Sequence, residues 1–70
     1  MKLSARNVLP GKVLSVKKGP ISSLVVIEIA PGVKLTSVVT ANAATELKLK
    51  KGAHASAVIK SSSIMLGIDD

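Results

Sequence analysis

The sequence has no cysteine and only one histidine, His54, in 70 residues. The missing cysteines exclude disulfides and thiolate zinc sites, and the single histidine excludes a multi-histidine metal site within one chain. A chain this short buries only about 60% of the surface of its unfolded state, so a lone monomer would be marginally stable. Small domains of this kind are stabilised by disulfides, a structural metal or oligomerisation. The composition therefore favours an oligomer.

Aromatic side chains are absent as well, and acidic ones are few. The chain has no Phe, Tyr or Trp, and its ten Lys and Arg residues outnumber its four Asp and Glu residues, for a net charge of +6. This charge indicates an anionic partner. Proteins that bind single-stranded nucleic acids rely on aromatic side chains that stack on the bases, and this chain has none. An OB-like nucleic-acid-binding module is therefore the alternative interpretation rather than the first one.

Long apolar runs and catalytic motifs are also missing. No apolar run approaches the roughly 20 residues of a membrane span, and no signal peptide begins at Lys2, so we expect a soluble cytoplasmic protein. None of the four carboxylates forms a recognisable motif with His54, no nucleophile elbow surrounds a serine, and no glycine-rich phosphate loop is present. The sequence predicts a binding protein and not an enzyme.

The residues that are present predict a single all-β domain over residues 1–70. Alternating apolar side chains predict five strands, at residues 11–18, 23–30, 33–40, 53–60 and 63–68. One short helix, residues 41–48, is expected between the third and fourth strands, with Thr40 as its N-cap. Five short strands and one helical turn are typical of a small barrel resembling the oligonucleotide/oligosaccharide-binding (OB) architecture. Asp69 and Asp70 are expected to form a solvated end.

Two segments of the predicted sheet carry further expectations. The strand at 23–30 is apolar on both faces, and such a strand is normally covered on both sides. Because so short a chain has few residues left to cover the second apolar face, we expect a neighbouring subunit to cover it. Pro31 and Gly32 mark the turn that follows. Because the φ angle of proline does not suit the first central position of a type I′ or II′ turn, we expect a hairpin slightly wider than the tightest two-residue kind.

Hydrogen-bond donors without nearby carboxylates gather in three places along the chain. They are Ser4 with Arg6, Thr40 to Ala43, and Lys60 with Ser61. Arginine supplies a rigid fork of donors that stays charged, and a helix N-terminus offers backbone N–H groups to an anion. Donors of this kind are what a site for a small, fully deprotonated oxyanion needs.

Other polar residues receive less specific interpretations. Ile21 and Ser22, whose N–H groups follow Pro20, form a second and weaker candidate for an anion site. His54 alternates with alanines and is interpreted as structural or exposed. The lysines at positions 48, 50 and 51 suit the C-terminus of the expected helix and are interpreted as a solvated face.

Several short motifs together resemble the molybdate-binding Mop proteins, or molbindins. They are Ser4-Ala5-Arg6-Asn7, Gly11-Lys12-Val13, the helical turn at Thr40, Gly52, and Val58-Ile59-Lys60 followed by Ser61-Ser62-Ser63-Ile64-Met65. The resemblance covers essentially the whole chain. The spacing of the first two motifs and the late Ile-Lys-Ser is specific for so short a sequence.

The resemblance implies a five-stranded OB-like barrel and a hexamer built as a trimer of dimers. It implies molybdate as the ligand, bound as an oxyanion with no metal directly coordinated by the protein, and tungstate as a close mimic. The site would lie between subunits and serve the storage or homeostasis of molybdenum. Its residues would be Ser4, Arg6, Lys60 and Ser61 of one subunit, with Thr40 and Ala43 of another. Sites near the threefold axis are implied too, with Ile21 and Ser22 as the weak candidate. Some relatives carry serine where this chain has Ala43, so only its N–H could donate here.

The chemistry of molybdate suits a pocket of donors. At neutral pH molybdate is a dianion with four acceptor oxygens and no proton. Hydrogen phosphate carries a proton, and leaving a buried polar group unpaired costs about 1–3 kcal/mol. Sulfate has no such proton but is smaller, so only the size of the pocket can reject it. Two further alternatives stay open at this point: a purely structural oligomerisation domain, and binding of the pterin of the molybdenum cofactor, although the chain has no ring to stack on a pterin.

Overall fold

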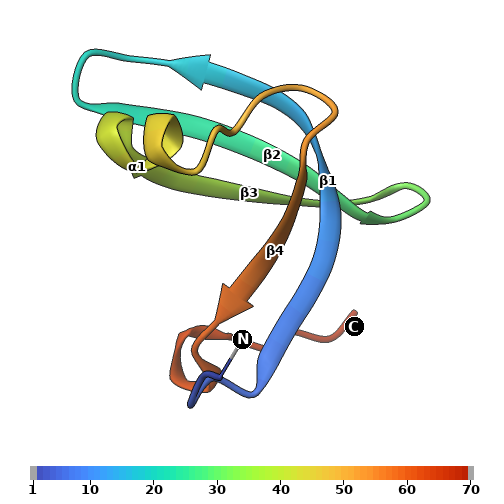
Figure 1. The fold of residues 1–70 in the computed structure, drawn as a ribbon. Coiled ribbons are helices and arrows are strands. Elements are labelled where there is room, and N and C mark those ends of the chain that lie inside the picture. The colour runs from blue at the N-terminus through green and yellow to red at the C-terminus, as the bar shows by residue number, and fades with distance from the viewer. Residues whose placement is uncertain (1, 70) are drawn as a thin grey trace.

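The computed structural model describes residues 2–69, which form one curled antiparallel sheet and a short helix (Figure 1). The elements are β1 (Asn7–Lys18), β2 (Ser22–Ala30), β3 (Val33–Thr40), α1 (Ala41–Glu46), β4 (His54–Ile59) and the 3₁₀ turn η1 (Ser61–Ser63). The strand order in the sheet is β3-β2-β1-β4. The expected all-β class and the helix between the third and fourth strands are therefore confirmed, and the number of strands is four.

β1 joins the two halves of the sheet. Its first half pairs with β4, from Asn7 opposite Ile59 to Lys12 opposite His54, and its second half pairs with β2, from Lys12 opposite Glu28 onward. The strand begins earlier than residue 11, where the sequence placed it. Pro10 is opposite Ser56 of β4 and precedes Lys12, where the pairing of β1 with β2 begins. Proline has no N–H to donate, but at this position β1 has no second neighbouring strand that would need one.

The hairpin between β2 and β3 is tighter than expected. Ala30 pairs with Val33, so only two residues form the connection, and the prediction of a wider loop is wrong. Gly32 has a φ of 77°, the value that the third residue of a type II turn requires after a proline. An irregularity between Glu28 and Ala30 accommodates this turn in the sheet. The conflict between Pro31 and the primed turns is thus resolved by a different turn type.

α1 begins where the sequence predicts and ends two residues early. Thr40 is the N-cap, and its side-chain oxygen accepts a hydrogen bond from the N–H of Ala43. The helix ends at Glu46, and Lys48 follows with a φ of 54°. The N–H of Leu49 donates to the carbonyl of Ala44, which closes the end of the helix. Ala44 is the buried residue of α1, so the helix is held against the sheet by a small side chain.

The core of the sheet is small. Val13, Val25 and Ile27 are buried together, and the partly buried side chains around them are Val16, Ile29, Leu35, Val39, Leu49, Ala53, Ala55 and Ala57. Ala53, Ala55 and Ala57 give this side of the core a thin face that allows close packing. Of the two apolar faces of β2, the one carrying Val25 and Ile27 is covered, whereas Leu24 on the other face is exposed.

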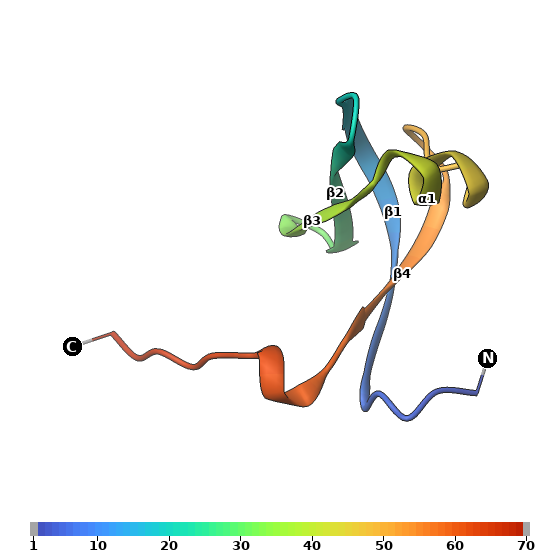
Figure 2. The same cartoon turned by 90° about the vertical axis from the view of Figure 1, so that its left-hand side faces the viewer.

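The fifth strand expected at residues 63–68 is not present. The chain passes through η1 after β4 and then runs away from the sheet without regular structure (Figure 2). Met65, Leu66 and Ile68 are each more than 90% exposed, at 93%, 95% and 93%. The alternation that predicted a strand is there, but in this chain the segment has no neighbouring strand to pair with. Asp70, expected as part of a solvated end, lies outside the described residues.

Candidate oxyanion-binding site

The register of β1 and β4 brings the two ends of the chain together. Asn7 and Ile59 are paired, and the side-chain amide Nδ2 of Asn7 donates to the carbonyl of Ile59 at 3.3 Å. Asn7 and Ile59 are 52 positions apart in sequence. Arg6 directly precedes Asn7 and Lys60 directly follows Ile59, so both cations lie next to this pair. The first and last of the three donor clusters predicted from the sequence thus lie at one end of the molecule.

A depression of about 620 Å³ lies at this end. The described residues that line it are Leu3, Ser4, Ala5, Val58, Lys60, Ser61 and Ser62. Three of the predicted site residues are among them: Ser4, Lys60 and Ser61. None of the lining residues is acidic, so the depression offers hydroxyl and ammonium donors and no carboxylate to repel an anion.

The backbone of η1 adds donors at the same place. Lys60 occupies the N-cap position of η1, and no side chain caps the turn. The N–H of Ser63 donates to the carbonyl of Lys60, and the N–H of Ile64 donates to the carbonyl of Ser61. The N–H groups that begin the turn are thus not taken by a capping side chain, and the first turn of a helix is where such groups face an anion.

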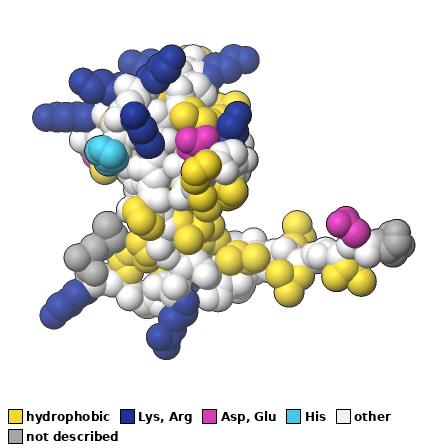
Figure 3. Space-filling view, turned by 90° about the vertical axis from the view of Figure 1, so that its right-hand side faces the viewer, with side chains coloured by type: hydrophobic (Ala, Val, Ile, Leu, Met, Phe, Trp, Pro, Cys, Tyr) yellow, Lys and Arg dark blue, Asp and Glu magenta, His cyan; other side chains and the backbone are white. Residues whose placement is uncertain are grey.

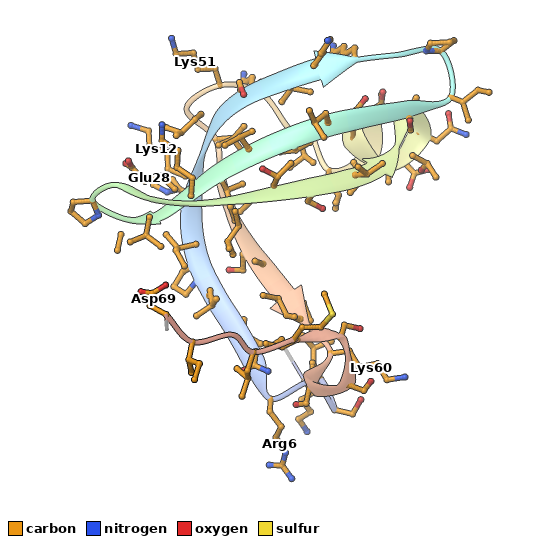
Figure 4. All side chains as sticks on the ribbon, turned by 180° about the vertical axis from the view of Figure 1, so that it is seen from behind. Arg6, Lys12, Glu28, Lys51, Lys60 and Asp69 are labelled. Atoms are coloured by element: carbon orange, nitrogen blue, oxygen red, sulfur yellow. The ribbon has the colours of Figure 1, made fainter. Side chains whose placement is uncertain are left out.

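Arg6 lies at this end but does not line the depression. Figure 4 shows that Arg6 and Lys60 leave the chain at neighbouring points and extend outward in different directions. Both side chains are exposed. A single chain therefore does not close its two cations around one ligand, and the guanidinium of Arg6 is directed beyond the chain that carries it.

Thr40 and Ala43, the third predicted cluster, lie apart from the depression. They belong to the junction of β3 and α1, which is well separated from the two chain ends (Figure 1). The N–H of Ala43 donates to Thr40 Oγ1 at 3.0 Å, so this N–H already has an acceptor. The hydroxyl of Thr40 still has its own proton to donate, because accepting a hydrogen bond leaves the O–H free. Within one chain the three clusters thus form two separate groups.

Ile21 and Ser22, the weaker candidate, lie beside Thr40. Ser22 is paired with Thr40, and the carbonyl of Ile21 accepts a hydrogen bond from the N–H of Ala41 at 2.9 Å. The carbonyl of Ser22 accepts from the N–H of Gly19 at 2.9 Å. Both of these contacts use carbonyl groups and not the N–H groups of Ile21 and Ser22, on which the weaker candidate rests.

Asn7 and Ser62 lie at the same end of the molecule, and the sequence pattern does not single them out. Asn7 ties the two chain ends together through its side chain, and Ser62 lines the depression beside Ser61. Both lie inside motifs that were noted, Ser-Ala-Arg-Asn and the triple serine. The signal that would have found them is the pairing register, which places residues 7 and 59 opposite each other.

Three other titratable groups lie in the sheet, away from this depression. His54 begins β4 opposite Lys12, and Lys12 is also opposite Glu28, so these three form a row across β4, β1 and β2 (Figure 4 labels Lys12 and Glu28). The described residues contain no cluster of three or more His, Cys, Asp or Glu side chains that could hold a metal ion. In residues 2–69, no helix has the length and apolar character needed to cross a membrane.

Comparison with known proteins agrees with this geometry. The TOBE domain family matches residues 3–66. Molybdenum-pterin-binding protein 1 of Clostridium pasteurianum is 50% identical over 66 residues, which are 94% of this chain and 97% of that protein. The structure of MopII from Clostridium pasteurianum is 45% identical with a TM-score of 0.89, and the match covers 96% of this chain and 100% of MopII.

A third similar protein is the cytoplasmic molybdate-binding protein ModG, solved with molybdate bound. It is 39% identical with a TM-score of 0.82, and the match covers 94% of this chain and 53% of ModG. The family match spans most of the chain, and both Clostridium proteins are matched over nearly their full length. This chain therefore belongs to the TOBE domain family and is of the Mop type.

Proposed function

We propose that this protein binds molybdate, with tungstate as a close mimic, as a store or buffer of molybdenum in the cytoplasm. The observation that carries the proposal is the depression lined by Ser4, Lys60 and Ser61, which contains donors and no carboxylate. Relatives named for molybdenum binding, and ModG with molybdate bound, support the choice of ligand. The protein acts as a binder, and no catalytic step is part of the proposal.

The donor set explains why molybdate is preferred to phosphate. The hydroxyl groups of Ser4 and Ser61 and the ammonium of Lys60 can all donate to the four oxygens of a dianion. Charge-assisted hydrogen bonds contribute about 1.5–3 kcal/mol each, so several together support micromolar affinity, near −8 kcal/mol. The proton of hydrogen phosphate finds no carboxylate to accept it, because none of the lining residues is acidic.

The bare oxyanion suits this chain better than a molybdenum-bound pterin. Several relatives are named molybdenum-pterin-binding proteins. A pterin is a flat ring system, and aromatic side chains are the usual platform for such a ring. The chain has no Phe, Tyr or Trp, and the depression is lined by small and aliphatic residues around its donors. We therefore assign the ligand as the anion itself.

We further propose that copies of the chain complete the site in an oligomer, and that this oligomer is a hexamer arranged as a trimer of dimers. In one chain Arg6 extends away from the depression, and Thr40 with Ala43 lies apart from it. A neighbouring copy can supply the hydroxyl of Thr40, with Ala43 beside it, to the Ser4, Arg6, Lys60 and Ser61 end of the first. Ligand binding at such a junction stabilises the assembly by mass action.

The surface of the chain supports this assembly. Its accessible surface is 5891 Å², against about 4,100 Å² for a compact monomer of 7.2 kDa. The excess is larger than the roughly 800 Å² that each partner buries in a standard interface. Figure 3 shows hydrophobic side chains along a tail that projects from the body, and Met65, Leu66 and Ile68 are almost fully exposed.

An apolar groove of about 370 Å³ is available for such a tail. It lies between the two edge strands, and its lining includes Leu35 and Val39 of β3, Leu49, and Ala57 and Ile59 of β4. The apolar tail of one copy, laid into this groove of another, would cover both surfaces at once. The fifth strand predicted from the sequence would then form between chains.

Native mass spectrometry with and without molybdate tests the function and the assembly together. We expect an oligomer of six chains that carries a whole number of bound molybdate ions and resists dissociation better when they are bound. A monomer that retains no anion would contradict both parts of the proposal. An oligomer identical with and without molybdate, and with no bound ion, would show a purely structural assembly.

A further inference from the structure

A second group of cations lies away from the oxyanion site. Lys and Arg side chains gather over the upper part of the molecule in Figure 3, and another group lies at the lower end. In the upper part, a shallow hollow of about 300 Å³ lies between the end of β1 and the turn that follows α1. The described residues that line it are Lys18, Ala44, Thr45, Lys48, Leu49 and Lys50.

Three lysines surround this hollow, and none of its lining residues is acidic. Lys18 comes from β1, whereas Lys48 and Lys50 come from the turn after α1, so the fold brings them together from two separate segments. Like charges held around one hollow repel each other unless an anion lies between them. The arrangement therefore favours an anionic ligand.

The backbone at Lys48 is a second, independent observation. Lys48 is the one non-glycine residue with a positive φ, 54°, among the described residues. Its N–H donates to the carbonyl of Thr45, so Lys48 occupies the position after a helix where glycine is usual. A side chain in this left-handed conformation costs backbone free energy that glycine would avoid. A lysine at this position is explained if its ammonium group binds an anion in the hollow.

The donors of the hollow differ from those of the oxyanion site. The hydroxyl of Thr45 donates to the carbonyl of Ala41, and the N–H groups of Lys48 and Leu49 donate to carbonyls of α1. These fixed donors are occupied, so only the flexible ammonium groups of the three lysines remain. Point charges on long side chains do not form a rigid cage for one tetrahedral ion, but they suit an extended anion whose charge is spread over several atoms.

We propose that this hollow, defined by Lys18, Lys48 and Lys50, is a binding site for a small anion that carries two or more linked phosphate groups. The three lysines that define it are not among the residues of the proposed molybdate site, which takes Thr40 and Ala43 from the beginning of α1. A polymeric nucleic acid is disfavoured, because the chain has no aromatic side chain to stack on its bases.

Tripolyphosphate is the probe that tests this site. It is titrated into the intact protein at low ionic strength, with binding followed by calorimetry and by the NMR shifts of backbone amides. We expect one tripolyphosphate per chain, bound more tightly than orthophosphate, with the largest shifts at residues 48–50. Equal affinity for orthophosphate, or shifts spread evenly over all lysines, would overturn the proposal. So would tighter binding of a single-stranded oligonucleotide with the same number of phosphates.

Two variants and a matched control localise the effect. Lys48→Gly and Lys50→Gln should each weaken tripolyphosphate binding by at least about threefold. Lys34→Gln removes the same charge from β3, outside the hollow, and should leave the affinity unchanged. Lys48→Gly should also raise Tm by about 4 °C or more, because glycine relieves the left-handed backbone. If Lys48 only caps α1, Lys48→Gly raises Tm without changing the affinity, and the proposal fails.

Discussion

The hydroxyl oxygen of Thr40 accepts a hydrogen bond from the N–H of Ala43 at 3.0 Å. This one contact caps α1 and also orients the hydroxyl, since the oxygen that accepts from Ala43 has its proton left for another partner. Thr40 therefore has two roles, one in stability and one in the proposed site. Substitutions that retain one role and remove the other can separate them.

Thr40→Asp should separate the two roles. Aspartate is a good N-cap, so the free energy of unfolding should stay within about 0.5 kcal/mol of wild type. The carboxylate cannot donate and repels a dianion, so molybdate affinity should fall by at least about tenfold. Thermal unfolding and calorimetric titration measure the two effects. Thr40→Ser retains both the cap and the donor and is the control; if Thr40→Asp binds molybdate as well as Thr40→Ser does, Thr40 is not a ligand.

Positive charge near the two ends of the chain should contribute more to molybdate affinity than positive charge elsewhere. Lys60→Met retains most of the bulk of the side chain and removes its charge, and we expect at least about a tenfold loss of molybdate affinity. Arg6→Ala should cause a loss of similar size if the guanidinium of one copy reaches the site. Lys34→Met, on β3, is the control for net charge. Calorimetric titration that gives equal affinities for Lys60→Met and Lys34→Met would remove Lys60 from the site.

The contacts between β1 and β4 show how much of the site could be predicted from the sequence. Residue types alone identified donors at Ser4, Arg6, Lys60 and Ser61, and the structure places Ser4, Lys60 and Ser61 around one depression. What the sequence could not give is the register that opposes Asn7 and Ile59, because it depends on how far β1 extends before residue 11. The hydrogen bond from the Asn7 side chain to Ile59 could not be predicted for the same reason.

The missing fifth strand has a different cause. Alternation of apolar residues at Ile64, Leu66 and Ile68 is a local signal, but a strand also needs a neighbour with free backbone groups. In the described chain this segment runs away from the sheet and has none. A pattern confined to one sequence cannot tell whether the neighbour is in the same chain or in another copy. The two-residue hairpin at Pro31 and Gly32 has another reason, because a type II turn accepts proline at its first central position whereas the primed turns do not.

Competition experiments test the donor-only chemistry of the depression. Orthophosphate at millimolar concentration should not displace molybdate, because its proton would lack a carboxylate acceptor, whereas excess tungstate should displace it completely. Sulfate, which has no proton, should compete better than orthophosphate to the extent that the pocket tolerates a smaller ion. Ready displacement of molybdate by orthophosphate would contradict the argument from the missing carboxylates.

The apolar tail should control assembly. Leu66 is 95% exposed, so Leu66→Asp costs little in an isolated chain. If the tail is buried against a second copy, the same change places a charge in an apolar groove and should shift the population toward monomers in native mass spectrometry. Lys51→Asp, an exposed position on the turn before β4, is the control for a new carboxylate elsewhere. An unchanged oligomer in Leu66→Asp would show that the tail does not contribute to the interface.

Close contact between strands at Gly11 should make that position intolerant of any side chain. A Cβ there would lie 2.7 Å from the carbonyl oxygen of Glu28, a backbone atom of β2 that cannot move without disturbing the sheet. We expect Gly11→Ala to lower the free energy of unfolding by about 1–3 kcal/mol. Gly67→Ala is the matched control, because nothing lies within 4 Å of the added Cβ in the described chain, and it should stay within about 0.5 kcal/mol of wild type. Chemical denaturation of the two variants under the same conditions measures the difference. Equal stabilities would mean that β1 and β2 are not held at this distance. The part of β1 that leads to the proposed oxyanion site would then be less tightly packed than the structure shows.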